Sequence, residues 1–306
     1  MAELNGGQIL VKSLVALGAT KSFGVPGESY LAVLDALYDT QGQLDYVLCR
    51  NEGGASFMAA AYGKLTGQPG ICFVTRGPGA TNASIGVHTA MQDSAPMILF
   101  VGQVGTDMKG REAFQEVDYP AVFGTMAKWA VEIDQIDRIP EILARAWTVA
   151  LTGRPGPVVV ALPEDMLTSL SSALPLTGPA RIAEPAPEAG ALADALALLA
   201  GAERPAILLG GCNWTDAGRA AFQAFAEGSD IPVIAALRYQ DMFDNHSPVY
   251  AGDLGLGLAE GVRTTMRDAD VVLAVNTRFG EISTEGYTLF AVPVPKQKVI
   301  HVHASP

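Results

Sequence analysis

Cysteine is scarce in this sequence: Cys49, Cys72 and Cys212 are the only three in 306 residues and lie far apart along the chain. Three cysteines cannot all pair within one chain, and their spacing matches no zinc-binding pattern. These two facts exclude a fully disulfide-bonded scaffold and a cysteine-rich zinc site. We therefore expect buried, unreactive thiols in a reducing compartment, namely the cytoplasm.

Positive charge and long apolar runs are also lacking. The chain has 20 Lys and Arg against 32 Asp and Glu, which gives a net charge of −12. Nucleic acids and anionic membranes bind basic faces, so neither is expected as a partner. Apolar runs such as residues 96–101 have the length of a strand, whereas a membrane-spanning helix needs ~20 residues. Residues 1–7 show no basic and apolar signal segment.

Apolar residues are plentiful instead, at 49% hydrophobic against 17% charged, which suffices for about two domains with substantial cores. Short Val, Ile, Leu and Phe runs alternate with helical patterns up to about residue 165, and their unbroken character indicates parallel strands buried on both faces. This βαβ rhythm predicts a three-layer α/β domain. We expect its strands near residues 21–25, 46–49, 70–75, 97–102 and 158–162, and helices near 31–38, 53–65, 80–91 and 139–151.

A change of composition marks the end of this domain. Residues 167–191 are rich in Ser, Pro, Ala and Glu, which is typical of an extended linker. A second α/β rhythm follows, with apolar strands near residues 206–209, 233–235, 271–275 and 299–302. We assign residues 1–168 to a first domain, 169–190 to a linker and 191–306 to a second, Rossmann-like domain. Because the sequence stops directly after a strand, a further helix or domain is expected to follow.

Glu52 lies at a predicted junction between a buried strand and a helix of small apolar residues. Desolvation at such a junction disfavours the charged form of a carboxylate, which suits a group that transfers protons. The alternative is that Glu52 only caps the helix, since a negative charge is favourable at a helix N-terminus.

Three glycine-containing turns follow strands of the first domain, at residues 24–27, 76–82 and 102–105. Ligands collect beyond the carboxyl ends of parallel strands, and the backbone N–H groups of a Gly-Pro-Gly turn at the head of a helix can bind an anion or a ring. No Lys-Ser/Thr pair follows the turn, so it is not a Walker-type phosphate loop. Each turn could also be an ordinary tight connection.

A long stretch without a clear helical pattern carries Phe114, Gln115 and, further on, Lys128. Long irregular loops in compact domains are often functional. An aromatic ring, an amide and a cation could together hold a small carboxylate or dicarbonyl compound. Alternatively, Phe114 packs against the protein and Lys128 is a solvated surface charge.

These segments together resemble one known family. The motifs FGVPG, RNEGGA, TRGPGATN, QDS, VGQV, FQEVD and TGRPGPV occur in this order at residues 23–27, 50–55, 75–82, 92–94, 101–104, 114–118 and 152–158. Each motif is weak alone, but the ordered set resembles the pyrimidine-binding domain of thiamine diphosphate-dependent enzymes of the acetolactate synthase group. The second half of the chain resembles the central domain of that family.

The resemblance implies a function and a cofactor. In the family the matching glutamate hydrogen-bonds N1′ of the aminopyrimidine of thiamine diphosphate, and so promotes loss of the proton from C2 of the thiazolium. The implied activity is carboligation or decarboxylation of a 2-keto acid such as pyruvate, with a place in branched-chain amino acid biosynthesis. The implied catalytic residues are Glu52, Gln115 and Lys128.

The resemblance also implies binding residues. Phe114, Gln115 and Lys128 match substrate-side positions of the family. The cofactor-side positions are Pro26, Gly27, Glu52, Thr75, Gly77, Pro78, Gly79, Asn82 and Gln103. Two departures from the family pattern are Asn51, where His is common, and Arg76, where Ser is common; the added charge of Arg76 puts the usual substrate in question.

The family binds the cofactor diphosphate through Mg²⁺ in a third domain with a Gly-Asp-Gly segment, and this segment is absent here. We therefore expect no metal ligands in this chain, and a homodimer or tetramer, or a separate diphosphate-domain chain, to complete the site. The glycine pair at 255–257 has the wrong spacing for a dinucleotide fingerprint, which disfavours FAD. His301 and His303 alternate on a strand and are expected to be structural. The alternatives are a 2-keto acid decarboxylase of the same family and a non-catalytic module that binds the cofactor.

Overall fold

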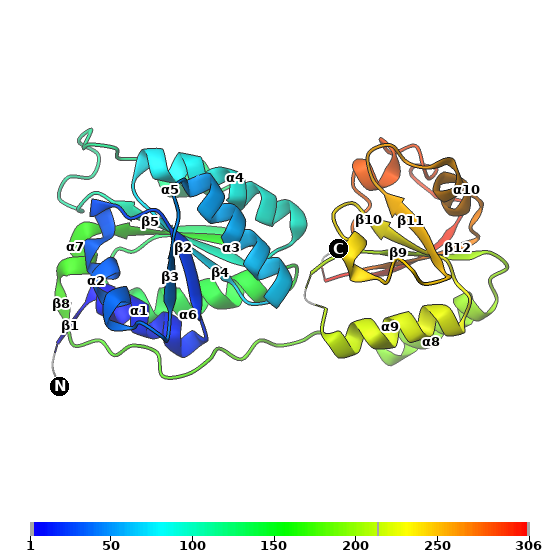
Figure 1. Ribbon diagram of the computed structural model, residues 1–306, viewed down its shortest axis with the longest axis horizontal. Helices are drawn as coiled ribbons and strands as arrows, with labels where there is room; N and C mark the ends of the chain where they lie inside the picture. The colour runs from blue at the N-terminus through cyan, green and yellow to red at the C-terminus, as the bar shows by residue number, and fades with distance from the viewer. Residues whose placement is uncertain (1–2, 213, 305–306) are drawn as a thin grey trace. The chain divides into compact units, whose positions relative to one another are not determined.

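The computed structural model describes residues 3–212 and 214–304, which form two compact units divided between residues 183 and 184 (Figure 1). Each unit contains a parallel β-sheet with helices on both faces, which confirms the predicted α/β class. The predicted linker at 169–190 is divided between the units, because its first part packs on the first unit. No helix among the described residues is long and apolar enough to cross a membrane.

The sheet of the first unit has six parallel strands in the order β3-β2-β4-β5-β7-β6. The central strands are uniformly apolar and fully buried, as their unbroken Val, Ile and Phe runs predict. An edge strand that the sequence did not reveal, β6, is only half-buried along its length. The strands are β2 (Lys21–Gly24), β3 (Asp45–Leu48), β4 (Gly70–Val74), β5 (Met97–Gln103), β6 (Trp129–Glu132) and β7 (Pro157–Pro163).

Helices cover both faces of this sheet (Figure 1). One face carries α1 (Gly6–Leu17), α2 (Leu31–Asp39) and α6 (Ile139–Leu151), and the other carries α3 (Glu52–Thr66) and α4 (Gly77–Asp93). Short elements complete the unit: the 3₁₀ turns η1 (Glu28–Tyr30) and η2 (Ile136–Arg138), and the helices α5 (Tyr119–Phe123) and α7 (Glu164–Thr168).

Alternate residues of the central strands build the core under α1, α2 and α6. Phe73 and Phe100 stack there with ring centroids 4.9 Å apart, and Trp147 of α6 is almost fully buried in the same cluster. Burying one such aromatic side chain contributes about 1.5–3 kcal/mol. On the opposite face α3 and α4 present small residues such as Ala59 and Ala83, which lets these two helices pack closely.

The segment after α7 closes the first unit on itself. β8 (Leu170–Ser171) pairs antiparallel with β1 (Leu4–Asn5), and the Leu176 amide donates to Ser13 Oγ at 3.1 Å. Ala173, Leu176 and Ala180 pack against the core of this unit. The Pro- and Ser-rich composition therefore does not make this stretch a free linker.

The second unit has five parallel strands in the order β11-β10-β9-β12-β13. Its strands are β9 (Pro205–Leu209), β10 (Val233–Ala236), β11 (Tyr250–Leu254), β12 (Val271–Val275) and β13 (Lys298–Val302). α8 (Ala189–Ala200) and α9 (Asp216–Gly228) cover one face, and α10 (Glu260–Asp268) lies on the other (Figure 1). The turns η3 (Gln240–Met242) and η4 (Ile282–Thr284) complete it.

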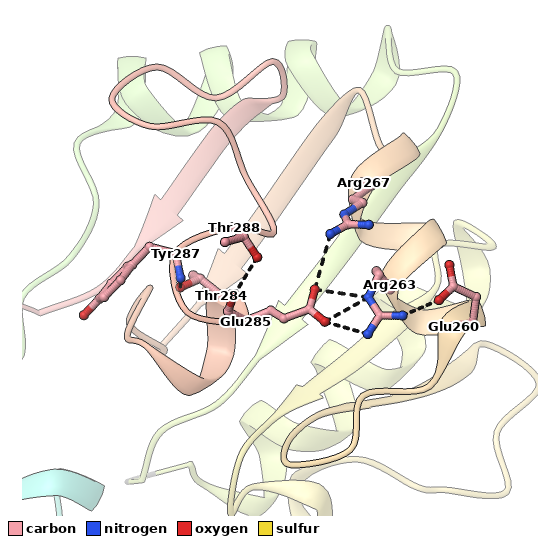
Figure 2. A network of polar contacts seen from close by, with 7 residues as sticks. All are labelled: Glu260, Arg263, Arg267, Thr284, Glu285, Tyr287 and Thr288. Carbon is pink, nitrogen blue, oxygen red and sulfur yellow. Dashed lines mark hydrogen bonds and ion pairs between the residues drawn. The ribbon is translucent and has the colours of Figure 1, made fainter.

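A polar network fastens the turn after η4 to α10 (Figure 2). Glu285, which has a positive φ of 51°, accepts hydrogen bonds from Arg263 Nε at 3.0 Å and Arg263 Nη2 at 2.5 Å, while Arg267 Nη2 lies 3.4 Å away. Arg263 also pairs with Glu260. Beyond this network the loop borders an apolar cavity of about 320 Å³ whose lining includes Tyr287.

Candidate functional site

The strand order of the first sheet predicts where a ligand can bind. The connection from β2 to β3 runs over one face and those that follow β3 and β4 run over the other, so the order reverses between β2 and β4. In open parallel sheets such a reversal opens a crevice at the carboxyl ends of the strands. The residues that follow β2, β3 and β4 include Pro26, Gly27, Glu52 and the 75–82 segment, so the strongest sequence predictions converge at this point.

Glu52 begins α3, and its half-buried carboxylate faces α4. Asn82 Nδ2 of α4 donates a hydrogen bond to Glu52 Oε2 at 3.0 Å, which fixes the orientation of the carboxylate. Among the described residues, none donates a hydrogen bond to the other oxygen, Oε1. The helix is capped by Asn51, whose Oδ1 accepts from the Gly54 amide at 3.2 Å. Because Asn51 performs the capping, Glu52 is free to present Oε1 to a ligand.

Glycines let the backbone approach closely beside this carboxylate. A Cβ on Gly79 would lie 2.9 Å from Thr75 Cγ2 and 3.5 Å from Glu52 Oε1, and a Cβ on Gly27 would lie 2.5 Å from Thr75 Cβ. Thr75 Oγ1 also hydrogen-bonds Ser29 Oγ at 2.9 Å, which ties the residue after β4 to η1. A side chain at Gly27 or Gly79 would collide with Thr75 and displace the backbone next to Glu52. Such a cradle beside a half-free carboxylate fits the edge of a flat heterocycle.

Behind this cradle lies a neutral, buried cluster. Tyr30 Oη donates to the Val25 carbonyl at 2.5 Å and lies 3.3 Å from Tyr46 Oη. Burial raises the pKa of Tyr46 to about 12, and burial also raises the pKa of Tyr30 and of the Cys72 thiol. These groups stay uncharged at neutral pH. They therefore add no charge to the poorly solvated region next to Glu52.

Gln103, predicted on the cofactor side, is committed to the protein. It is 1% exposed, and its Nε2 donates to the Val117 carbonyl at 2.8 Å and to Glu132 Oε2 at 3.2 Å. Glu132 Oε1 also accepts from Lys109 Nζ at 2.5 Å. Gln103 therefore connects the end of β5 to the edge strand β6 and to the loop at residues 104–118. We call this loop the 104–118 loop.

The 104–118 loop brings two predicted substrate-side residues to the head of α4. The Gly77 amide donates to the Gln115 carbonyl at 3.1 Å, so Gln115 lies beside the Gly-Pro-Gly turn, with Pro78 exposed at its surface. Gln115 has a positive φ of 63°, which is strained for a residue with a side chain. Phe114 is 72% exposed and has no packing role in this unit.

Lys128 is not brought to this site. It directly precedes β6, and its amide donates to the Pro157 carbonyl at the start of β7, so it lies at the amino edge of the sheet, opposite to Glu52. Its Nζ donates to the Val149 carbonyl and, at 2.7 Å, to the Thr152 carbonyl at the end of α6. Burial, helped by nearby Arg154, lowers the pKa of Lys128 to about 8.

The structure adds a residue whose role the sequence did not reveal. Arg76, flagged only as a departure from the family pattern, has a side chain that is 12% exposed. Its Nη2 donates to Glu164 Oε1 at 2.9 Å and lies 3.7 Å from Glu28 Oε1, and its Nη1 donates to the Phe114 carbonyl at 3.4 Å. The signal that could have revealed the pairing is the position of Glu164, directly after β7 at the same edge of the sheet.

The two histidines of the second unit form a packed pair. His301 and His303 stack at 5.3 Å, and His301 Nε2 is bonded to the Thr277 carbonyl at 2.8 Å. A search of the part of the chain that the structure describes finds no group of three or more His, Cys, Asp or Glu residues able to hold a metal ion.

Two family models match the sequence. Residues 4–122 match the model described as "Thiamine pyrophosphate enzyme, N-terminal TPP binding domain", and residues 192–306 match "Thiamine pyrophosphate enzyme, central domain". The first match contains the whole Glu52 crevice, and the second covers the sheet of the second unit.

Curated relatives match over the full chain. It is 34% identical to the acetolactate synthase isozyme 3 large subunit of Escherichia coli, with 100% of this chain and 54% of the relative covered. It is 33% identical to the probable acetolactate synthase large subunit of Methanocaldococcus jannaschii, covering 99% and 51%. For the acetolactate synthase large subunit of Corynebacterium glutamicum the identity is 33%, covering 99% and 48%. The chain thus spans about half the length of these relatives.

Proposed function

Because the chain belongs to the thiamine pyrophosphate enzyme family, we propose that it supplies the pyrimidine-binding half of a thiamine diphosphate site in an acetolactate synthase-like enzyme. The proposed reaction joins or decarboxylates 2-keto acids, with pyruvate as the donor. The observation that carries this proposal is the carboxylate of Glu52, which is held by Asn82 on one oxygen and leaves the other facing a glycine-lined crevice.

Thiamine diphosphate, when bound, supplies a carbon nucleophile that adds to the keto carbon and accepts the electron pair released by loss of CO₂. The chain's own contribution is to bind and orient the pyrimidine ring and to manage its proton. Glu52 would share a proton with N1′ of the ring through Oε1, and Asn82 would keep that oxygen aimed at the ring. Gly27, Gly79 and Thr75 would line the ring, with Pro26, Gly77 and Pro78 at the margins of the crevice.

On the substrate side, Phe114 and Gln115 lie on the 104–118 loop next to the Gly77 turn, which supports a role in holding the keto acid. Gln103 would act through this loop, because its side chain is bonded to the protein. Lys128 lies at the far edge of the sheet and has no part in the site that this unit forms by itself.

The other half of the site would come from a diphosphate-binding domain that holds Mg²⁺, either in a second copy or in a separate chain. The surface next to Glu52 supports this: α3 and α4 expose Phe57, Met58 and Ile85, and isolated soluble domains seldom leave apolar side chains grouped in this way. We propose that a homodimer or tetramer covers this surface.

Three further points belong to the proposal. FAD in the central domain is disfavoured rather than excluded, because the glycine pair at 255–257 lacks the dinucleotide spacing. The enzyme works in the cytoplasm, which the three free, buried cysteines support. The keto acid is the small-molecule partner.

The test is to measure pyruvate consumption and thiamine diphosphate binding by this chain with and without a supplied diphosphate domain and Mg²⁺. We expect both to appear only in the complete assembly, with acetolactate as product. Acetaldehyde alone would assign the chain to the decarboxylases of the family. Cofactor binding without turnover would indicate a non-catalytic module, and a yellow chromophore would indicate that FAD binds.

A further inference from the structure

Two successive carbonyls of the 104–118 loop are bound by two successive residues at the head of α4. Arg76 Nη1 donates to the Phe114 carbonyl at 3.4 Å, and the Gly77 amide donates to the Gln115 carbonyl at 3.1 Å. These carbonyls belong to the two peptide planes on either side of the Gln115 Cα, so fixing both planes fixes the direction in which the Gln115 side chain leaves the backbone, and the first plane also anchors the Cα of Phe114.

The guanidinium of Arg76 is held from the opposite side by carboxylates. Glu164 of α7 binds Nη2 at 2.9 Å, and Glu28 of η1 lies 3.7 Å from the same nitrogen. These two acidic residues neutralise the cation. An anionic substrate therefore gains little attraction from Arg76. Any influence of Arg76 on substrate binding must act through the position of the 104–118 loop.

The arrangement is costly, which argues that it is retained for a purpose. Arg76 Nε is buried and has no hydrogen-bond partner among the described residues, and Gln115 adopts a left-handed backbone conformation. Unpaired buried donors and left-handed residues other than glycine both lower stability, and both occur often at functional sites. Here the unpaired donor belongs to Arg76 and the left-handed residue is Gln115, and these residues lie on the two sides of the contact between the head of α4 and the 104–118 loop.

We propose that Arg76 is a positioning residue that clamps the 104–118 loop onto the head of α4 and so orients Phe114 and Gln115. The clamp is a property of this chain alone. Only its effect on the choice of acceptor keto acid rests on the proposed function, in which these two side chains face the substrate.

Hydrogen exchange in the isolated chain tests the clamp without any cofactor. The Gly77 amide is a specific reporter, because its acceptor is the loop carbonyl of Gln115. In Arg76→Ala we expect this amide to exchange about tenfold faster, since a hydrogen bond from a charged group is lost. In Arg76→Lys the increase in the exchange rate should be smaller, because a single ammonium group can replace only some of the hydrogen bonds that the guanidinium donates.

The matched control is Arg111→Ala, an exposed arginine of the same loop that bonds, within the described part of the chain, only to the Asp107 carbonyl at 3.3 Å. Amides of β5 serve as the internal standard for global stability. If Arg76→Ala fails to fold, Arg76→Lys and Glu164→Gln carry the test, and both should speed exchange at Gly77. Exchange at Gly77 that is unchanged in every folded variant overturns the proposal.

A second readout separates positioning from a general structural role. A Phe114→Trp reporter, which the exposed position tolerates, should lose fluorescence anisotropy in the Arg76→Ala background and not in the Arg111→Ala background. In a complete, active assembly, Arg76→Ala should raise the KM for the acceptor without changing the rate of C2 proton exchange. If the clamp readouts change but no assembly is active, the proposed function fails while the clamp stands.

Discussion

The two edges of the first sheet use similar side chains in opposite ways. At the carboxyl edge, Glu52 keeps one oxygen without a donor and glycines let the backbone approach closely beside it. At the amino edge, the polar groups are closed off: Lys128 donates to two carbonyls at the end of α6, and Arg154 donates to Ser94 Oγ at 2.9 Å and to the Met91 carbonyl. A carboxylate oxygen open to a ligand distinguishes the binding edge, whereas the cations of the structural edge are bonded to oxygens of the protein.

The largest effect is expected at the carboxyl edge. In an active assembly, Glu52→Gln should slow exchange of the C2 proton of thiamine diphosphate by at least ~100-fold, since it removes the group that shares the proton. The measurement is deuterium exchange followed by NMR. Glu141→Gln, an exposed glutamate of α6, is the control and should be silent. An exchange rate that is the same in Glu52→Gln and the parent would remove Glu52 from the mechanism.

Paired glycine substitutions sharpen the contrast between packing and binding. A Cβ on Gly63 would lie 2.0 Å from the Pro96 carbonyl oxygen near the amino edge, whereas a Cβ on Gly79 would lie 2.9 Å from a methyl group of Thr75 and at ordinary contact distance from Glu52 Oε1 and Val74 Cβ. Gly63→Ala should therefore lower the free energy of unfolding by about 1–3 kcal/mol. Gly79→Ala should change it by less than about 1 kcal/mol, because alanine favours the helix.

For the affinity of thiamine diphosphate, the order of the two variants should be the reverse of their order in stability. Gly79→Ala places a methyl group beside Glu52 Oε1 and should weaken thiamine diphosphate binding about tenfold, a loss of ~1.4 kcal/mol, as measured by titration calorimetry in the assembly. Gly63→Ala should leave the affinity unchanged. Equal affinities for the two variants would show that the crevice is not the ring site.

The pH dependence of stability distinguishes the lysines of the two edges. Burial lowers the pKa of Lys128 to about 8, below its value of ~10.4 in an unfolded chain. Between these values the unfolded chain holds a proton that the folded chain has released, so the stability of the parent relative to Lys128→Met should rise with pH. Urea unfolding at about pH 7 and about pH 9.5 measures this slope.

Lys109 at the carboxyl edge is the matched control. The hydrogen bond to Glu132 raises the pKa of Lys109, so its contribution stays constant below the unfolded pKa of ~10.4 and is lost only at higher pH. The difference between the parent and Lys109→Met should therefore be the same at both pH values. A stability difference that changes with pH for Lys109→Met, or one that does not change for Lys128→Met, would contradict the contrast drawn between these two lysines.

The smallest effect on stability is expected at Phe114. Its side chain is 72% exposed, so Phe114→Ala should change the free energy of unfolding by less than ~0.5 kcal/mol. In the assembly the same variant should alter the ratio of products from competing acceptor keto acids, as followed by chromatography. Unchanged product ratios would leave Phe114 without a substrate role.

The alternation of apolar runs and helical patterns predicted both sheets, because strands such as β4 and β5 are buried on both faces and are apolar up to Gln103 at the end of β5. The strands β6 and β11 were missed because each is an edge strand that is mostly half-buried and lacks such a run. The grouping of Glu52 with the glycine turns followed from strand ends meeting at one edge.

Long-range contacts could not be read in the same way. Arg76 and Glu164 are 88 positions apart, and nothing local in the sequence shows that their side chains meet. The edge that Lys128 occupies depends on β6, so missing this strand also concealed the position of the lysine. Likewise, the Pro-rich stretch after α7 looks like a linker in composition and becomes part of the first unit only through its pairing with β1.

That pairing of β1 with β8 has a practical consequence. The strands Leu4–Asn5 and Leu170–Ser171 are neighbours joined by backbone hydrogen bonds, and the polypeptide then continues along the first unit as far as residue 183. A segment whose two ends adjoin in this way tolerates circular permutation with little rearrangement of its interior, provided that residues 172–183 stay attached to the surface on which they pack. The crevice and its loop would stay intact in such a permuted chain.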